Sequence, residues 1–185
     1  MSDRDDGAAV LRPRIEGPKV TLRPGVAADV PRLWDIRAEP SVRRWWGEPE
    51  SAETIATQLL AAEPADDVLL VVEVDGDVVG GIQYGEETEA DYRHASIDIY
   101  LSGPRQGQGI GSEAVALLAR FLLEARQHHR LTIDPAADNE PAIRCYERVG
   151  FRRVGVMRQY ERGPDGKFHD GLLMDLLAAD LRAPG

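Results

Sequence analysis

The segment Gln106-Gly107-Gln108-Gly109-Ile110-Gly111 decides the fold, because it joins two stretches of different hydrophobic periodicity. Residues 93–101, which precede it, alternate apolar and polar side chains, and this alternation indicates a strand with one buried face. Residues 112–125, which follow it, repeat apolar side chains at helical spacing. The glycines allow a tight turn between the strand and the helix. The N–H groups at the start of the helix are then free to bind an anion such as a phosphate or pyrophosphate.

The spacing of the glycines and their neighbours distinguishes the kinds of glycine-rich loop that bind a phosphate at the start of a helix. A P-loop requires a lysine after its last glycine, but Ser112 directly follows Gly111. The dinucleotide-binding pattern requires glycine at position 112, although Asp134 would supply its downstream acidic residue. The acetyltransferase pattern [RQ]-x-x-G-x-[GA] matches, and a glycine-rich turn without a ligand is the remaining alternative. On the acetyltransferase interpretation, the cofactor-binding residues of the loop are Gln106, Gly107, Gln108, Gly109, Ile110, Gly111 and Ser112.

A second motif follows 28 residues after Gly111: Asn139-Glu-Pro-Ala-Ile-Arg-Cys-Tyr-Glu-Arg-Val-Gly-Phe151. Together the two motifs resemble the GNAT superfamily of acyl-CoA-dependent N-acetyltransferases, and the resemblance spans residues 20–177. It implies that acetyl-CoA is the co-substrate. It also implies that Asn139 bonds the pantetheine arm or nearby backbone and that Tyr146 faces the sulfur. Without the resemblance, Asn139 reads as a helix N-cap and Tyr146 as a half-buried aromatic residue.

The order of the expected elements predicts an α/β domain. We expect strands at 20–23, 68–74, 78–82, 93–101, 131–134, 151–160 and 168–177. Helices are expected after Asp29, from Ser41 to Gly47, at 51–62, at 112–125 and after Asn139, with Asp29, Ser41 and Asn139 as caps. Residues 85–91 are expected to form a polar loop and residues 1–18 a flexible lead-in to a single domain at 19–180. This order predicts a mixed sheet with helices on its faces. The resemblance to the GNAT superfamily implies the GNAT fold, a central mixed, mostly antiparallel sheet flanked by helices.

Two further stretches bear on the acceptor. Arg44-Trp-Trp-Gly47 and Thr132-Ile-Asp-Pro135, the latter leading into the second motif, resemble the aminoglycoside 6′-N-acetyltransferases. An aminoglycoside is a rigid polycation, so its site needs carboxylates that converge on ammonium groups. Trp46, Asp98 and Asp134 are the expected substrate-binding residues, although tryptophans on a helix are usually core residues. Acetyltransferases of siderophore precursors carry a related aromatic element, which leaves that substrate class open.

The same resemblance suggests a mechanism. Asp98 lies on the polar face of its strand and is the expected general base for the attacking amine. Backbone N–H groups around Tyr100 and Leu101 would polarise the thioester oxygen, and Tyr146 would protonate the leaving thiolate. The amine would attack directly. Cys145 offers a covalent alternative, but its place on the apolar stripe of its helix favours an inert core thiol.

Composition bounds the remaining possibilities. The chain has 185 residues, 32 acidic against 22 basic side chains and a formal charge of −10. This balance argues against a nucleic-acid partner and suits a small cationic amine. A single cysteine excludes an intrachain disulfide, and no apolar run is long enough for a membrane span. We expect a cytoplasmic protein without a metal, either monomer or homodimer. The alternative acceptors are another small amine, such as a polyamine, and a protein N-terminus. The alternative function is a sensor that binds acyl-CoA without catalysis.

Overall fold

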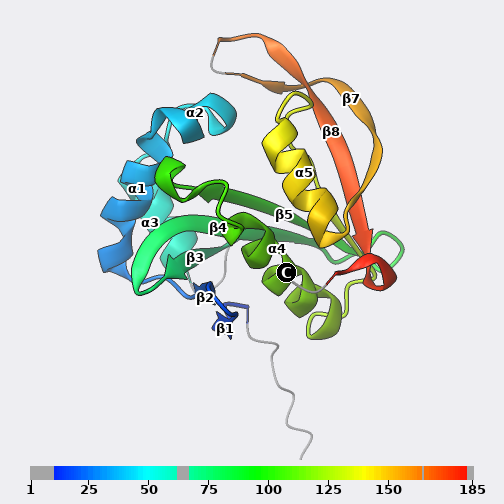
Figure 1. Ribbon diagram of the computed structural model, residues 1–185, viewed down its shortest axis with the longest axis horizontal. Coiled ribbons are helices and arrows are strands. Elements are labelled where there is room, and N and C mark those ends of the chain that lie inside the picture. The colour runs from blue at the N-terminus through cyan, green and yellow to red at the C-terminus, as the bar shows by residue number, and fades with distance from the viewer. Residues whose placement is uncertain (1–10, 62–66, 164, 183–185) are drawn as a thin grey trace, which may run out of the picture.

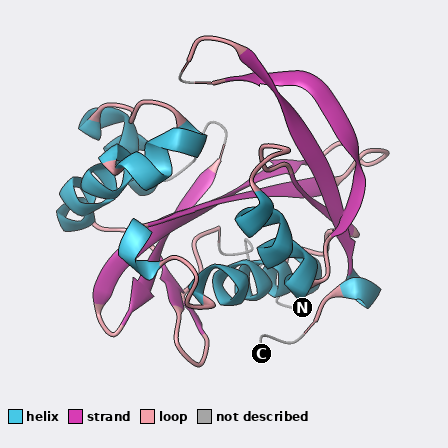
Figure 2. Cartoon of the chain, turned by 45° about the horizontal axis from the view of Figure 1, so that its top comes forward, coloured by secondary structure: helices cyan, strands magenta, loops and turns pink. Residues whose placement is uncertain are grey.

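A computed structural model describes residues 11–61, 67–163 and 165–182. They form one eight-stranded sheet in the order β1-β2-β3-β4-β5-β6-β8-β7, with helices on both faces (Figures 1 and 2). The strands are β1 (Ile15–Glu16), β2 (Thr21–Arg23), β3 (Val68–Val74), β4 (Asp77–Glu87), β5 (His94–Leu101), β6 (Arg130–Ile133), β7 (Arg152–Arg162) and β8 (Phe168–Leu177). The helices are α1 (Val30–Ala38), α2 (Pro40–Trp46), α3 (Ala52–Leu60), α4 (Ile110–Glu124) and α5 (Glu140–Val149), with short 3₁₀ turns at Ala27–Asp29, Gly103–Arg105 and Ala178–Asp180. The expected mixed, mostly antiparallel sheet is confirmed.

The central strand β3 divides the hydrophobic core into two parts. Its residues Val68, Leu70 and Val72 pack with α4 and α5 in the larger core. Leu69 and Val71 point to the opposite face and pack with α1, α2 and α3 in the smaller core. Because successive side chains of a strand face opposite sides, a nearly continuous apolar run is what a strand covered on both faces requires.

One junction in the sheet is parallel, and it is short. Within the described residues, β5 pairs with β6 only at Ala95↔Leu131 and Ser96↔Thr132. From Ile97 onward β5 still pairs with β4, but in the described part of the chain β5 no longer pairs with β6. The two strands therefore separate toward the glycine-rich segment, and their carboxyl ends flank an opening in the sheet.

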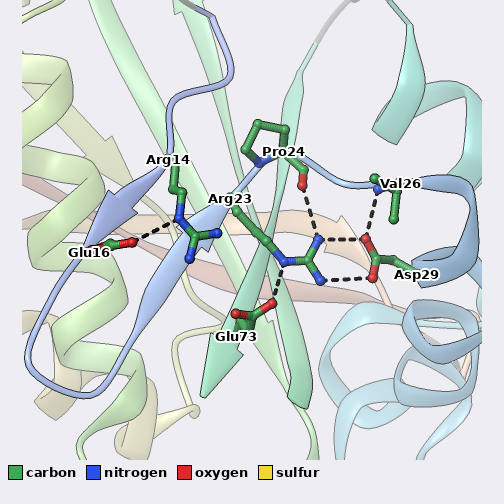
Figure 3. A network of polar contacts seen from close by, with 7 residues as sticks. All are labelled: Arg14, Glu16, Arg23, Pro24, Val26, Asp29 and Glu73. Carbon is green, nitrogen blue, oxygen red and sulfur yellow. Dashed lines mark hydrogen bonds and ion pairs between the residues drawn. The ribbon is translucent and has the colours of Figure 1, made fainter. Parts of the chain in front are cut away.

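A buried ion-pair network fixes the first strands to the start of α1 (Figure 3). The Arg23 guanidinium donates to both carboxylate oxygens of Asp29, at 2.7 and 2.9 Å, and to Glu73 at 2.5 Å. The hydrogen bonds from Arg23 lower the pKa of Asp29. Asp29 occupies the N-cap position of α1 as expected, but its side chain makes no cap hydrogen bond and instead accepts from Val26 N and from Arg23.

The other departures from expectation are local. The helix α2 begins at Pro40 and follows Glu39, so Ser41 is inside the helix rather than its cap. The Glu39 carboxylate is used elsewhere, because it accepts from Ser102 Oγ and Gly103 N. Strand β4 extends to Glu87, so part of the expected polar loop at 85–91 is strand. Strand β1 lies within the segment 1–18 that was expected as a lead-in, of which residues 1–10 lie outside the described part of the chain.

Candidate active site

The opening between β5 and β6 leads into a cleft of about 1020 Å³. Its walls come from α2, the end of β5, the glycine-rich loop, the segment after β6, α5 and β7. Of the expected site residues, those that line it are Trp46, Asp98, Tyr100, Leu101, Gln106, Gly107, Gly109, Gly111, Ser112, Asp134, Asn139 and Tyr146. The fold thus brings both sequence motifs and the expected acceptor residues to one concave surface.

The glycine-rich loop forms an open cradle. Gly107 and Gly109 have φ of +75° and +84°, a conformation that favours glycine, and no atom lies within 4 Å of a Cβ placed on either residue. Helix α4 starts at Ile110, and no side chain caps its first turn. Its first N–H groups and the positive end of its dipole therefore face this cradle, which suits the phosphates of a coenzyme.

Two expected loop residues have other roles. Ile110 is 3% exposed and belongs to the larger core, so its side chain does not line the cleft. Gln108 donates its side-chain amide to Pro104 O at 2.6 Å, and it is also not a lining residue. Gln106 does line the cleft and donates to Leu101 O at 2.9 Å, so it ties the loop to the end of β5.

Helix α5 forms the wall opposite the loop. Asn139 caps the helix as predicted, because its side-chain oxygen accepts from Ala142 N at 3.3 Å. Tyr146 is 7% exposed, and burial raises the pKa of its hydroxyl, with the nearby Cys145, Asp98 and Asp134 adding to the effect. A phenol in these surroundings stays protonated, as a proton donor must.

Cys145 was expected to be an inert thiol in the core, and it is partly buried and packs against the larger core. Its side chain lines the cleft, and a Cβ placed on Gly111 would lie 3.5 Å from its sulfur. Burial raises the pKa of the thiol, while Ser112 and Arg148 oppose this effect through hydrogen bonds. The raised pKa disfavours the thiolate that a nucleophile would need.

Asp98 lies in the middle of a row of polar groups that crosses the sheet. Gln83 on β4 is its direct antiparallel neighbour, and Gln83 also donates to Asp67 at 3.2 Å. Burial raises the pKa of Asp98 to about 7, and the carboxylates of Asp134, Asp67 and Glu161 add to this increase. The hydrogen bond from Gln83 opposes it. A carboxylate with a pKa near neutrality is suited to accept and release a proton at physiological pH.

Tyr160 and Glu161 on β7 also line the cleft, and the sequence analysis missed both. The Tyr160 hydroxyl is hydrogen-bonded to Asp134, and this bond raises the pKa of Tyr160 to about 12. Burial raises the pKa of Glu161, and the nearby Asp134 carboxylate contributes to the increase. Strand β7 read as an ordinary final strand, so its sequence carried no signal that these two residues reach the cleft.

An aromatic wall closes the side formed by α2. The rings of Trp46 and Tyr100 meet edge to face, with centroids 5.2 Å apart. The guanidinium of Arg37 lies 4.7 Å from the Trp46 ring centroid and 5.5 Å from that of Tyr100. Arg37 is 3% exposed and also bonds Glu50 at 3.2 Å, so it holds both rings from behind the wall.

A mixed sheet that opens beside a glycine-rich helix start, with acids and a buried tyrosine in the opening, defines an acyl-transferring enzyme fold. A family model described as "Acetyltransferase (GNAT) domain" matches residues 19–152. The chain therefore belongs to the GNAT acetyltransferases, and the expected family is confirmed.

The chain is also similar to individual acetyltransferases. An aminoglycoside N(6′)-acetyltransferase type 1 of Klebsiella pneumoniae is 29% identical over 166 residues, which cover 80% of this chain and 79% of that protein. The structure of RimJ from Mycobacterium smegmatis with CoA-disulfide has a TM-score of 0.81 and 26% identity, covering 96% and 92% of the two chains. The structure of aminoglycoside acetyltransferase AAC(6′)-Ib with coenzyme A has a TM-score of 0.70 and 26% identity, covering 87% and 96%.

The described residues contain neither a metal-binding cluster nor a helix suited to span a membrane. They contain no group of three or more His, Cys, Asp or Glu side chains placed to hold a metal ion. In the same part of the chain, no helix combines the length and the apolar character that a membrane span requires.

Proposed function

We propose that the protein transfers the acetyl group of acetyl-CoA to the 6′-amine of aminoglycosides by direct attack, a reaction that would give antibiotic resistance. The observation that carries the proposal is the convergence of Asp98, Asp134 and Glu161 on a single cleft. Three carboxylates that line one cleft make a poor site for an anion and a good site for several ammonium groups. The similarity to aminoglycoside 6′-acetyltransferases supports the same substrate class.

The residues present fit the acyl coenzyme. The cradle at Gly107, Gly109 and Gly111 and the start of α4 would hold its pyrophosphate. Asn139 and the end of β5, at Tyr100 and Leu101, would hold the arm that carries the thioester. When bound, the coenzyme supplies an activated acetyl group. The unpaired edge of β5 can also donate backbone N–H groups to the developing oxyanion.

Asp98 would act as the general base. The 6′-amine arrives as an ammonium ion and must lose a proton before its lone pair can attack the acetyl carbon. The Asp98 carboxylate accepts this proton directly or through a water molecule. Asp134, held by the Tyr160 hydroxyl, would bind a neighbouring ammonium group, and Trp46 would provide a flat wall for a sugar ring.

Tyr146 would act as the general acid. Cleavage of the carbon–sulfur bond leaves a thiolate, which takes the proton of the Tyr146 hydroxyl. The buried position of Tyr146 on α5, facing the same cleft as Asp98, is the geometry that this role requires. The nitrogen loses a second proton as the amide forms, and this proton restores the Tyr146 hydroxyl, directly or through water. The proton that Asp98 received returns to solvent, so the products are the amide, the free thiol and one proton.

A peptide N-terminus is the second candidate acceptor. The TM-score of 0.81 with RimJ exceeds the value of 0.70 with AAC(6′)-Ib, so overall likeness alone does not single out an aminoglycoside acceptor. A peptide α-amine carries a single positive charge, however, and would leave most of the carboxylates in the cleft without a cation. We therefore place the aminoglycoside first.

The proposal is tested by following CoA release from acetyl-CoA with a thiol reagent. The acceptor panel contains kanamycin A, tobramycin, spermidine, N6-hydroxylysine and a peptide with a free N-terminus. We expect kcat/KM for the two aminoglycosides to exceed that for the other amines by 100-fold or more. Preferred turnover of the peptide, the polyamine or the hydroxylysine would overturn the substrate assignment and leave the family membership unchanged.

A further inference from the structure

The arm formed by β7 and β8 carries an irregularity next to the cleft. Met157 pairs with Gly171 and Glu161 pairs with His169, so three residues of β7 lie opposite Asp170 alone. Within this bulge Gln159 has φ of +51°, which is rare for a residue other than glycine. The Asp170 carboxylate accepts from Gln159 N at 2.8 Å and holds the bulge in this conformation.

The bulge aims two consecutive side chains at the cleft. In a regular strand Tyr160 and Glu161 would point to opposite faces, but here both line the cleft. Bulges commonly redirect side chains next to active sites. Both residues remain exposed at the rim, where an incoming acceptor can reach them.

Gly171 makes room for this arrangement. A Cβ at this position would lie 2.9 Å from the ring of Tyr160 and 3.2 Å from the end of Met157. On the other side of β8, the segment after Asp134 pairs with the strand, with Leu172 N donating to Pro135 O at 2.8 Å. Tyr160 can therefore reach across β8 at the glycine and bond the Asp134 carboxylate.

We propose that this bulge forms a second acceptor subsite, in which Glu161 binds an ammonium group remote from the reacting amine and Tyr160 orients Asp134 toward the same molecule. The inference rests on the proposed function and specifies it further, because it assigns recognition of acceptors with several positive charges to the β7–β8 arm. Asp98 accepts the proton of the reacting nitrogen. Glu161 and Tyr160 distinguish a polycation from a simple amine that carries the same reacting group.

The matched acceptors for the test are kanamycin A and 6-amino-6-deoxyglucose, which share a sugar amine but differ in the number of ammonium groups. The variants are Glu161→Gln, Tyr160→Phe and Gly171→Ala. Glu124→Gln is the control, because it makes the same charge change on an exposed residue of α4 that does not line the cleft. Thermal unfolding and the KM for acetyl-CoA show that each variant is folded and binds its co-substrate.

For Glu161→Gln we expect the KM for kanamycin A to rise about tenfold with kcat within twofold, as the loss of one favourable charge pair implies. The KM for 6-amino-6-deoxyglucose should change less than twofold. Gly171→Ala and Tyr160→Phe should raise the KM for kanamycin A in the same way, although neither removes a charge. The control should match the wild type on both acceptors.

Two outcomes would overturn the inference while the proposed function stands. One is a KM for kanamycin A that Glu161→Gln and Gly171→Ala leave unchanged. The other is an equal rise for both acceptors, which would place Glu161 at the reacting amine. Absence of wild-type turnover on kanamycin A would instead overturn the proposed function, and the inference with it, so the wild-type measurement separates the two failures.

Discussion

Asp98 shows how much the chemistry of one residue depends on its neighbours. The amide donor Gln83 lies beside it on the neighbouring strand, and the carboxylates of Asp67 and Asp134 are close enough to affect its largely buried side chain. Burial and like charge favour the neutral acid, while the hydrogen bond from Gln83 favours the carboxylate. The result is a pKa of about 7, where a small change in any neighbour alters the fraction of enzyme ready to act as a base.

The first prediction concerns the pH dependence of catalysis. A general base must be unprotonated, so kcat/KM for kanamycin A should fall as the pH decreases through about 7. Gln83→Leu removes the hydrogen bond that favours the carboxylate and should move this midpoint upward. Asp98→Asn should lower kcat/KM by about 100-fold and abolish the acidic limb. An acidic limb with a midpoint below pH 5 in the wild type would contradict the role of Asp98.

The second prediction follows from the same pKa through linkage. Because folding raises the pKa of Asp98, this residue costs no stability below the unfolded pKa near 4. Its cost grows as the pH rises from about 4 to about 7 and is fully present above that value. Asp98→Asn should therefore increase the free energy of unfolding at pH 8 by on the order of 2 kcal/mol. The gain should disappear at pH 4. Urea unfolding at the two pH values measures this, and an equal effect at both would show that Asp98 is not destabilised by its charge.

The third prediction concerns Tyr146. Tyr146→Phe keeps the ring that packs near Phe151 and removes only the hydroxyl. We expect kcat to fall by about 10- to 100-fold, the usual contribution of a proton donor, with little change in the KM for acetyl-CoA. Steady-state kinetics with acetyl-CoA as the varied substrate measures both constants. An unchanged kcat would show that another group protonates the thiolate.

At the scale of single elements, the site combines features that sequence patterns reveal and features that they hide. The β5 alternation, the glycine-rich loop and the Asn139 cap each depend on residues close together in sequence, and the structure has all three. Asp29 occupies the N-cap position of α1, but its carboxylate bonds Arg23 and Val26 N instead of capping the helix. The cap expected at Ser41 was wrong because α2 already begins at Pro40. Strand β1 has only two residues, too few for a periodic signal.

The β7 bulge is the element that sequence could not predict. It depends on a register shift between β7 and β8 and on Asp170 holding Gln159 from the neighbouring strand. Neither partner is local to Tyr160 and Glu161, and no glycine or proline in β7 between Met157 and Glu161 marks the interruption. When a neighbouring strand determines the position of a site residue, the sequence around that residue shows no pattern that would reveal its role.

The fourth prediction tests the bulge as a structural element. Gln159 has a positive φ that a β-branched side chain tolerates poorly, so Gln159→Val should reduce the free energy of unfolding by about 1–2 kcal/mol. Gln159→Gly accepts the conformation and should leave stability equal to the wild type or slightly higher. Urea unfolding of both variants measures the difference. Equal stability of the two would mean that the backbone of residue 159 is not held in this conformation in solution.

At the scale of the whole molecule, the sheet determines where β5 and β6 separate and so where the cleft lies. Helices cover both faces and leave β5 and β6 free to separate beyond two residue pairs (Figure 2). The glycine-rich loop, α5 and the β7–β8 arm surround this gap. The cleft is therefore lined by residues that range from 41 to 161 in the sequence. The two motifs and the order of elements predicted this architecture, and the family comparison confirmed it.

The overall charge agrees with the site. A formal charge of −10 gives the molecule a field that attracts a polycationic acceptor from a distance. The carboxylates of the cleft add local contacts to this general attraction, while the start of α4 supplies the positive end of a dipole where the coenzyme phosphates would bind. The acidic half of the cleft therefore suits the proposed cationic acceptor, and the positive half suits the phosphates of the coenzyme.

The most direct measurement of the central claim, acetyl transfer to a 6′-amine, compares neomycin B with paromomycin I, which differ in a 6′-amine and a 6′-hydroxyl. CoA release is followed with each acceptor at the same enzyme and acetyl-CoA concentrations. The account predicts rapid release with neomycin B and release at the background rate with paromomycin I. Equal turnover of the two compounds would place the acetyl group on another amine, and no turnover of either would remove aminoglycosides as the substrate.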